Sequence, residues 1–219
     1  WKYRCWQNKI IRIKGFSMSG IIAQNSGRHT GLVKASSGGG GVWNLIKTYT
    51  ASDDANLTFV DGTDGVDFSA YDEFVFKFYD LNPATDGGQF SFNFTTDGTN
   101  YNATKTSTAI ECYHAEDDSA TVFLYRALGL AQSTGNQVFM VGIGNGSDEC
   151  GVGYLQLFAP SSTTFVKHFI ADCNFAQNAD MTFTEPTAGY INTTSAVTGA
   201  RFLMHSGNFD GTISLYGIS

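Results

Sequence analysis

Carboxylates are the side chains of this sequence best suited to chemistry, and the reaction they would catalyse is glycoside hydrolysis. That reaction needs two carboxylates that face one cleft. Glu111, Glu116 and Glu149 are the candidates. Neither their spacing nor a shared motif pairs any two of them, so we expect no catalytic residues and a protein that is not an enzyme.

Acidic clusters and the other metal-ligating residues predict no bound metal. Acidic residues gather at 53–54, 61–67 and 116–118, but calcium takes about six to eight oxygen ligands and these spacings match no standard calcium loop. We interpret the clusters as solvated turns, with calcium binding as the alternative. The four histidines lack ligand spacing and the four cysteines form no Cys-x-x-Cys motif. We therefore expect no metal and no other cofactor.

One aromatic residue lies in a polar stretch of sequence that is suited to contact with a sugar. Tyr101 follows Asn100 in a polar stretch, and an exposed aromatic ring beside hydrogen-bonding groups can stack on a sugar ring. Asn100 and Tyr101 are the predicted glycan contacts. An ordinary surface tyrosine is the alternative.

The elements that must position these side chains are strands, and the segment 71–98 predicts the centre of the fold. Alternate residues of a strand point to opposite faces of its sheet. Six phenylalanines alternate with other residues on either side of a turn rich in Asp and Gly, which predicts a central hairpin with one buried face: Phe74, Phe76, Phe78, Phe90, Phe92 and Phe94.

The rest of the chain predicts an all-β domain over 42–219. Strands are expected near 42–49, 56–60, 109–113, 121–126, 137–143, 153–158 and 165–174. Segments 201–205 and 212–216 are expected to form a closing hairpin, in which Ile213 and Leu215 point inward. About ten to twelve short strands at this spacing predict an antiparallel two-sheet β-sandwich of jelly-roll type.

The distribution of charge excludes two classes of partner. Five of the 13 basic residues lie in the first 14 positions, and no acidic residue precedes Met18. From Met18 onward, eight basic residues face 20 acidic ones, a net charge of −12. Because such a body repels phosphate groups, we expect neither a nucleic-acid nor a membrane partner.

The N-terminal region differs in composition from the predicted sandwich. Residues 1–17 are basic, and we expect them to be a non-native or disordered extension before a natural start at Met18. A real basic arm that docks on an acidic partner is the alternative. Residues 18–41 are rich in Gly and Ser and end in four glycines, Gly38 to Gly41, which predict an irregular arm with a flexible joint.

Three blocks of sequence resemble a family. They are GIIAQNSGRHTGLVKA with VWNLIKTYTAS (20–35 and 42–52), FYDLNPATDGGQFSFNFTTDGTNYN (78–102) and GYINTTSAVTGARFLMHSGNFDGTISLYGIS (189–219). With them, residues 18–219 resemble virion structural proteins of tailed bacteriophages, of the tail-fibre or capsid-decoration kind. None of the blocks is a catalytic motif.

The resemblance implies a location in the virion, an extracellular particle, and a non-enzymatic structural role. The partners would be other virion proteins and further copies of the chain, since similar proteins form homo-oligomers that are commonly trimers on fibres. Ile21, Ile22, Arg28 and Leu32 would anchor the arm, and the sandwich would be displayed to host-surface glycans. A carbohydrate-binding module or a glycan-degrading domain is the alternative, which a coplanar aromatic platform or an acid pair in a cleft would favour.

Overall fold

The computed structural model describes residues 42–219, and within that range it is an all-β protein without helices. No described segment is a helix of the length and apolarity that crossing a membrane requires. The thirteen strands are β1 (Trp43–Asp54), β2 (Asn56–Val60), β3 (Glu73–Pro83), β4 (Gly88–Thr95), β5 (Lys105–Ala115), β6 (Thr121–Tyr125), β7 (Gln137–Ile143), β8 (Gly151–Phe158), β9 (Lys167–Gln177), β10 (Met181–Thr184), β11 (Thr187–Ile191), β12 (Gly199–Met204) and β13 (Phe209–Ile218).

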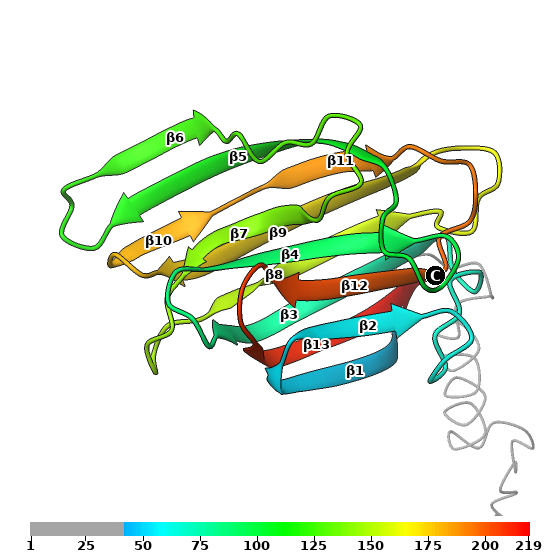
Figure 1. The fold of residues 1–219 in the computed structure, drawn as a ribbon, viewed down its shortest axis with the longest axis horizontal. Coiled ribbons are helices and arrows are strands. Elements are labelled where there is room, and N and C mark those ends of the chain that lie inside the picture. The colour runs from blue at the N-terminus through cyan, green and yellow to red at the C-terminus, as the bar shows by residue number, and fades with distance from the viewer. Residues whose placement is uncertain (1–41) are drawn as a thin grey trace, which may run out of the picture. The chain divides into compact units, whose positions relative to one another are not determined.

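Eight of the strands form a jelly roll. Its signature is a set of nested antiparallel pairs, in which the first strand pairs with the last and the second with the last but one. Here β1 pairs with β13, β2 with β12, β3 with β8 and β4 with β7, all antiparallel. The pairs assemble into one sheet ordered β1-β13-β3-β8 and a second ordered β2-β12-β4-β7 (Figure 1). The expected antiparallel β-sandwich of jelly-roll type is confirmed.

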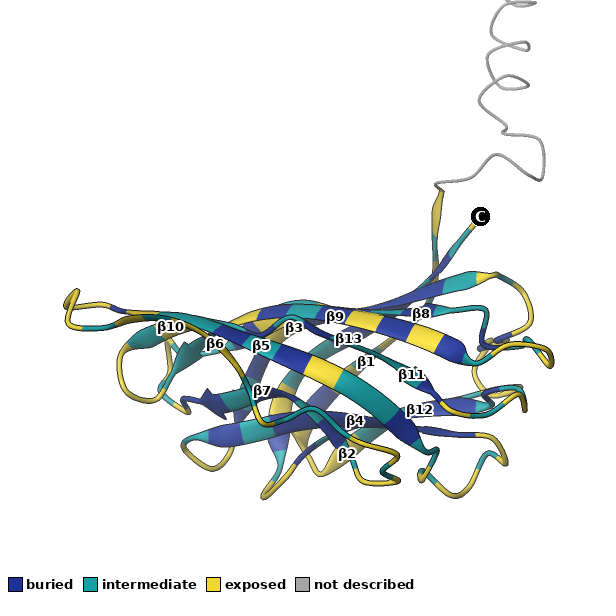
Figure 2. Cartoon of the chain, turned by 90° about the horizontal axis from the view of Figure 1, so that it is seen from above, coloured by how far each residue is buried: buried dark blue, intermediate teal, exposed yellow. Residues whose placement is uncertain are grey.

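The core lies between these sheets and is built largely from phenylalanine. All six phenylalanines of the segment 71–98 are fully buried. Phe76 of β3 packs on Phe202 of β12 with ring centroids 5.0 Å apart, and Phe78 packs on Phe139 of β7 at 5.4 Å. Buried and exposed residues alternate along β5 and β9, as period 2 requires (Figure 2).

The predicted central hairpin is wrong. β3 and β4 follow one another in the chain but lie in different sheets, since β3 pairs with β13 and β8 while β4 pairs with β12 and β7. The turn at Gly87, where φ is +71°, therefore leads the chain across the sandwich. The six rings face each other across the core instead of sharing one side of a hairpin.

The predicted closing hairpin is wrong for the same reason. β12 pairs with β2 and β4 in one sheet, and β13 pairs with β1 and β3 in the other. Ile213 and Leu215 are fully buried, so the inward face expected for the last strand is confirmed.

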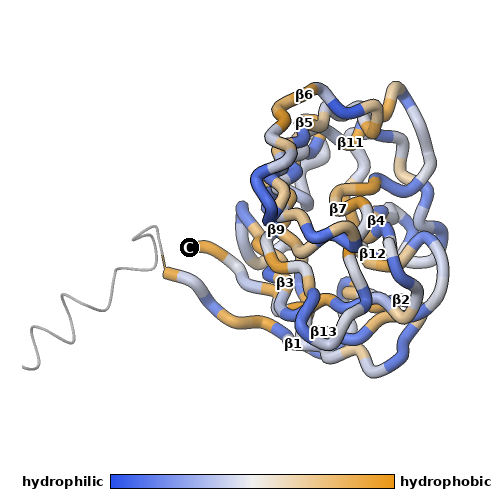
Figure 3. The backbone as a smooth tube through the Cα atoms, turned by 90° about the vertical axis from the view of Figure 1, so that its left-hand side faces the viewer, coloured by the Kyte–Doolittle hydropathy of each residue, from blue (hydrophilic) through white to orange (hydrophobic). Residues whose placement is uncertain are grey.

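The other five strands widen the first sheet beyond β8. β9 pairs with β8, and both β10 and β11 pair with β9 and with β5. β6 pairs with β5 alone among the described residues. We call β5, β6, β10 and β11 the overhang, because they lie beyond the second sheet, at the end of the domain away from β1 and β2 (Figure 3). The second sheet meets β9 at one residue pair, Ile143 with Gln177.

Several predictions fall outside the described residues. These are the extension at 1–17, the arm at 18–41 with its four glycines, and the anchoring residues Ile21, Ile22, Arg28 and Leu32.

Candidate functional site

A groove lies on the inner face of the overhang, where the second sheet ends. It has a volume of about 370 Å³. Its lining comes from β5, β6, β7, β9 and β10, from the residue after β6 and from the turn between β9 and β10. It combines apolar side chains with an ion pair: Glu111, Tyr113, Leu124, Arg126, Val141, Gln177, Ala179, Met181 and Phe183. We call this feature the inner groove.

Three aromatic rings stand in a row along the floor of the overhang. The strand register places Tyr113 of β5 beside Phe183 of β10, and Phe183 beside Phe175 of β9. Tyr113 and Phe183 stack with centroids 4.8 Å apart and an interplanar angle of 15°, and Phe183 and Phe175 follow at 5.5 Å and 25°. Because the rings stack on each other, they present mainly their edges to the inner groove.

Glu111 and Arg126 form the polar end of the groove, and a second glutamate, Glu185, is buried beside Glu111. Glu111 of β5 is buried, and its Oε2 lies 2.8 Å from Nη1 of Arg126. Glu185, between β10 and β11, has no exposed surface. Burial is the main cause that raises the pKa of Glu185 to about 8; the negative charge of Glu111 acts in the same direction, and Arg126 opposes the shift.

Burial favours the protonated form of Glu185 beside the ion pair of Glu111 and Arg126. The side chain of Glu185 lies within hydrogen-bonding reach of the Glu111 side chain and of the Val141 backbone. Retaining glycosidases keep their two carboxyl groups about 5 Å apart and open to the sugar between them. A buried Glu185 that keeps its proton beside Glu111 suits the positioning of Arg126 better than it suits hydrolysis.

The three glutamates considered from the sequence do not meet in one site. Glu149 lies in the turn after β7, where its Oε2 accepts a hydrogen bond from the Gly146 backbone N–H at 2.6 Å. Glu116 lies in the exposed turn between β5 and β6. Glu149 shares a shallow pocket with Asp80, Asp148 and Asp210, and Glu116 shares one with Asp117 and Asp180. Glu111 has a fully buried carboxyl neighbour, Glu185, which was missed because the short strand before it gave no alternating pattern.

The predicted glycan contacts lie at the other end of the domain. The Arg201 guanidinium carbon is 4.8 Å from the centroid of the Tyr101 ring, so one face of that ring is covered. Asn100 donates to both carboxylate oxygens of Asp97, from its backbone N–H at 2.7 Å and from its side chain at 2.8 Å. The side chain of Asn100 thus stabilises a turn, and glycan contact by this pair stays a prediction.

Aspartates of the cluster at 61–67 make structural contacts, within their own turn and with β1. Asp61 accepts a hydrogen bond from the Phe68 backbone N–H, and Asp64 accepts one from the Tyr49 hydroxyl, each at 2.8 Å. Lys47 Nζ lies 3.2 Å from Asp64. Within residues 42–219 there is no group of three or more side chains arranged to hold a metal ion.

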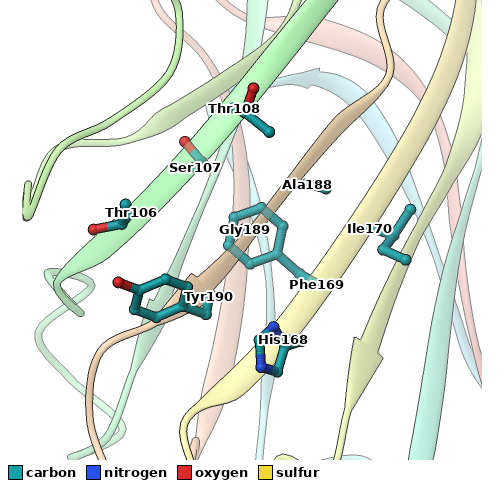
Figure 4. Close-up of a pocket in the computed structure, with 9 residues that line it drawn as sticks. All are labelled: Thr106, Ser107, Thr108, His168, Phe169, Ile170, Ala188, Gly189 and Tyr190. Carbon is teal, nitrogen blue, oxygen red and sulfur yellow. The ribbon is translucent and has the colours of Figure 1, made fainter.

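A second concavity lies on the opposite, outer face of the overhang. This outer hollow has a volume of about 570 Å³, and β5, β9 and β11 form it. Figure 4 shows Tyr190, His168 and Thr106 at one end and Ile170 and Thr108 at the other, with Ala188 and Gly189 between them. The rings of His168 and Tyr190 are 6.0 Å apart. With few charged groups nearby, the hollow is suited to apolar contact.

A buried lysine joins the overhang to the second sheet. Lys105 at the start of β5 donates from Nζ to Oδ1 of Asn93 in β4 at 2.6 Å and to the Ala103 carbonyl at 2.7 Å. Burial lowers the pKa of Lys105 to about 8. The lysine fixes one end of the strand that carries Glu111 and Tyr113.

The fold and the groove together define an all-β jelly-roll protein with an enlarged sheet. Comparisons with models of protein families, with curated proteins and with solved structures gave no match to the chain.

Proposed function

We propose that the chain is a non-enzymatic structural protein of a tailed-bacteriophage virion, a tail-fibre or capsid-decoration component that displays its sandwich for attachment to the host surface. The jelly-roll topology carries the proposal, because this architecture serves in viral capsid and lectin domains. The three sequence blocks that resemble phage virion proteins support the same role.

The chemistry of the inner groove also favours a role without catalysis. Glu185 is fully buried and keeps its proton, and Arg126 is held by Glu111. No second free carboxylate lies in the groove lining. The groove can therefore bind a ligand without supplying an acid and a base to it.

The proposal is tested on particles. Phage particles that package the gene are purified on a density gradient and analysed by quantitative mass spectrometry. We expect peptides of this chain at copy numbers comparable with those of other structural proteins. Absence of the chain from such particles would overturn the proposal.

A carbohydrate-binding module or glycan-degrading domain is the second candidate. The observation that favours it is the ion pair of Glu111 and Arg126 beside aromatic rings in one groove, with Glu185 buried next to Glu111. Incubation with purified host-surface polysaccharide tests whether the chain hydrolyses the glycan. Release of reducing ends that is lost in Glu185→Gln, and kept in the exposed control Glu116→Gln, would establish hydrolysis and overturn the non-enzymatic role.

A further inference from the structure

The outermost strand of the overhang, β6, is an edge strand with large apolar side chains in solvent. Phe123 is 74% exposed and Tyr125 is 66% exposed. Only one side of β6 is hydrogen-bonded to a strand in the described chain, and the other side is open (Figure 1). An open edge of this kind is a template for pairing with another chain.

The opposite edge of the same sheet is protected, and β6 is not. β1 contains register shifts between Leu45 and Lys47 and between Ala51 and Asp54, and it carries charged residues. Bulges and charges of this kind discourage edge-to-edge pairing. β6 reads TVFLY, which has no charge and no proline, and its five pairs with β5 are in unbroken register.

The backbone of β6 presents a regular set of hydrogen-bonding groups at its open side. The Arg126 N–H donates to the Ala109 carbonyl, and the Ala115 N–H donates to the Ala120 carbonyl. Even-numbered residues of the strand thus face β5. By the alternation of a β-strand, the N–H and C=O groups of Thr121, Phe123 and Tyr125 point to the open side.

We propose that β6 pairs antiparallel with β6 of a second copy of this chain, about a two-fold axis at Phe123. In this register Thr121 lies opposite Tyr125 of the other copy, and Phe123 lies opposite itself. All three outward residues then form hydrogen-bonded pairs, and their side chains share the outer face. A two-fold contact closes on itself, so the assembly ends at a dimer.

The charges at the two ends of β6 favour antiparallel over parallel pairing. They also favour a second copy of this chain as the partner. The turn before β6 holds Asp117 and Asp118, and the Asp118 side chain is 90% exposed. Arg126 follows β6 directly, with a third of its side chain exposed. Antiparallel pairing brings the acidic turn of each copy toward Arg126 of the other, whereas parallel pairing would set like charges together.

The pairing also places the inner grooves of the two copies side by side. Leu124 and Arg126 line the inner groove and lie at or beside the edge that would become the junction. Since a two-fold axis perpendicular to a sheet keeps both inner faces on the same side, two inner grooves would lie next to each other across the junction. A displayed dimer of this form would offer two adjacent ligand sites.

The test compares two equally exposed phenylalanines in the full-length chain. Phe123→Lys places a charge in the middle of the open edge, and Phe165→Lys is the control, because Phe165 is 72% exposed in a loop before β9. Molar mass is measured by sedimentation velocity over a range of concentrations, and folding of each variant is checked by circular dichroism. We expect a dimer for the wild type and for Phe165→Lys, with dimerisation weakened at least about tenfold in Phe123→Lys. A monomeric wild type, a dimer unaffected by Phe123→Lys, or growth beyond a dimer that Phe123→Lys does not reduce would overturn the proposal.

A cross-linking experiment tests the register separately from any other contact. Cys112 lies opposite Phe123 within the chain, so it is first replaced by serine. Cα atoms of a hydrogen-bonded antiparallel pair are about 5.5 Å apart, within the range that a disulfide spans. We expect Cys112→Ser/Phe123→Cys to form a covalent dimer on mild oxidation and Cys112→Ser/Phe165→Cys to stay monomeric. Equal cross-linking of the two variants, or none in either, would contradict the two-fold register.

Discussion

Glu185 shows how one buried side chain makes the inner groove depend on pH. A carboxyl group with no exposed surface loses the hydration that stabilises its charge, so it keeps its proton well above its ordinary pKa. Glu111 lies beside it and pairs with Arg126, whose Nη1 is 2.8 Å from Glu111 Oε2. Ionisation of Glu185 would place an additional, unpaired negative charge in the interior. The ion pair that lines the groove is therefore coupled to the proton on Glu185.

This coupling predicts a loss of stability as pH rises. Between the ordinary glutamate pKa and about 8, the unfolded chain releases a proton that the folded chain retains, so the free energy of unfolding falls with pH. The slope is at most about 1.4 kcal/mol per pH unit. We expect urea unfolding at pH 5 to 8 to show this decline in the wild type and a flatter profile in Glu185→Gln, whose amide can still donate to Glu111.

The control for this prediction is Glu116→Gln, which changes an exposed glutamate in the turn after β5. It is expected to keep the slope of the wild type. A wild type whose stability does not change between pH 5 and 8, or a Glu185→Gln variant with an unchanged slope, would contradict the assignment of the proton to Glu185.

At the scale of the strand, alternation in the sequence predicted which face of a strand is buried better than it predicted which strands pair. β2 and β7 have the predicted bounds, and the six alternating phenylalanines are buried as expected. The alternation of apolar and polar residues indicates which side of a strand is apolar. The alternation does not indicate whether two such strands lie side by side in one sheet or face each other across the core, since both arrangements bury the same residues. The wrong hairpins at β3–β4 and β12–β13 follow from that ambiguity.

The candidate site was predictable only in part. Glu111 was considered as an acid because of its residue type, but its partner Glu185 lies in another segment of the chain. β10 has four residues, and Pro186 and Gly189 interrupt the alternation between it and β11, so neither strand was predicted. The pairing of both with β5 and β9 is a tertiary property that no local pattern records.

The facing arrangement of the phenylalanines makes single rings important to stability. Phe92 of β4 is fully buried and packs against Phe94, Phe139 and Phe169, with centroids 5.1 to 5.3 Å away. We expect Phe92→Ala to lower the free energy of unfolding by about 3–5 kcal/mol, because the cavity would open between both sheets. Chemical denaturation measures the change.

Phe165→Ala is the matched control, since that ring is 72% exposed and its loss should cost within about 0.5 kcal/mol. A cost below about 1 kcal/mol for Phe92→Ala would mean that β4 does not contribute this face to the core.

For the whole molecule, nested pairing ties the two ends of the described chain to each other. β1 and β13 pair along nearly their full lengths, from Trp43 with Ile218 to Asp54 with Phe209. The strands beyond the eight of the jelly roll enter as two insertions, β5–β6 between β4 and β7, and β9–β11 between β8 and β12. The insertions build the overhang and its groove without breaking the nested pairs. The main core thus lies between the two sheets of the jelly roll, whereas the inner groove lies on the overhang.

This division predicts opposite outcomes for two deletions. β13 lies between β1 and β3 and supplies the buried residues Phe209, Ile213 and Leu215, so removing residues 208–219 separates β1 from its sheet and opens the core. We expect that variant not to fold, as judged by loss of cooperative thermal unfolding and of near-ultraviolet circular dichroism. The comparison is a chain lacking residues 18–41, which we expect to keep a cooperative transition and to fail to join particles. A folded C-terminal deletion, or an unfolded variant without residues 18–41, would show that the nested pairs of 42–219 are not what holds the domain together.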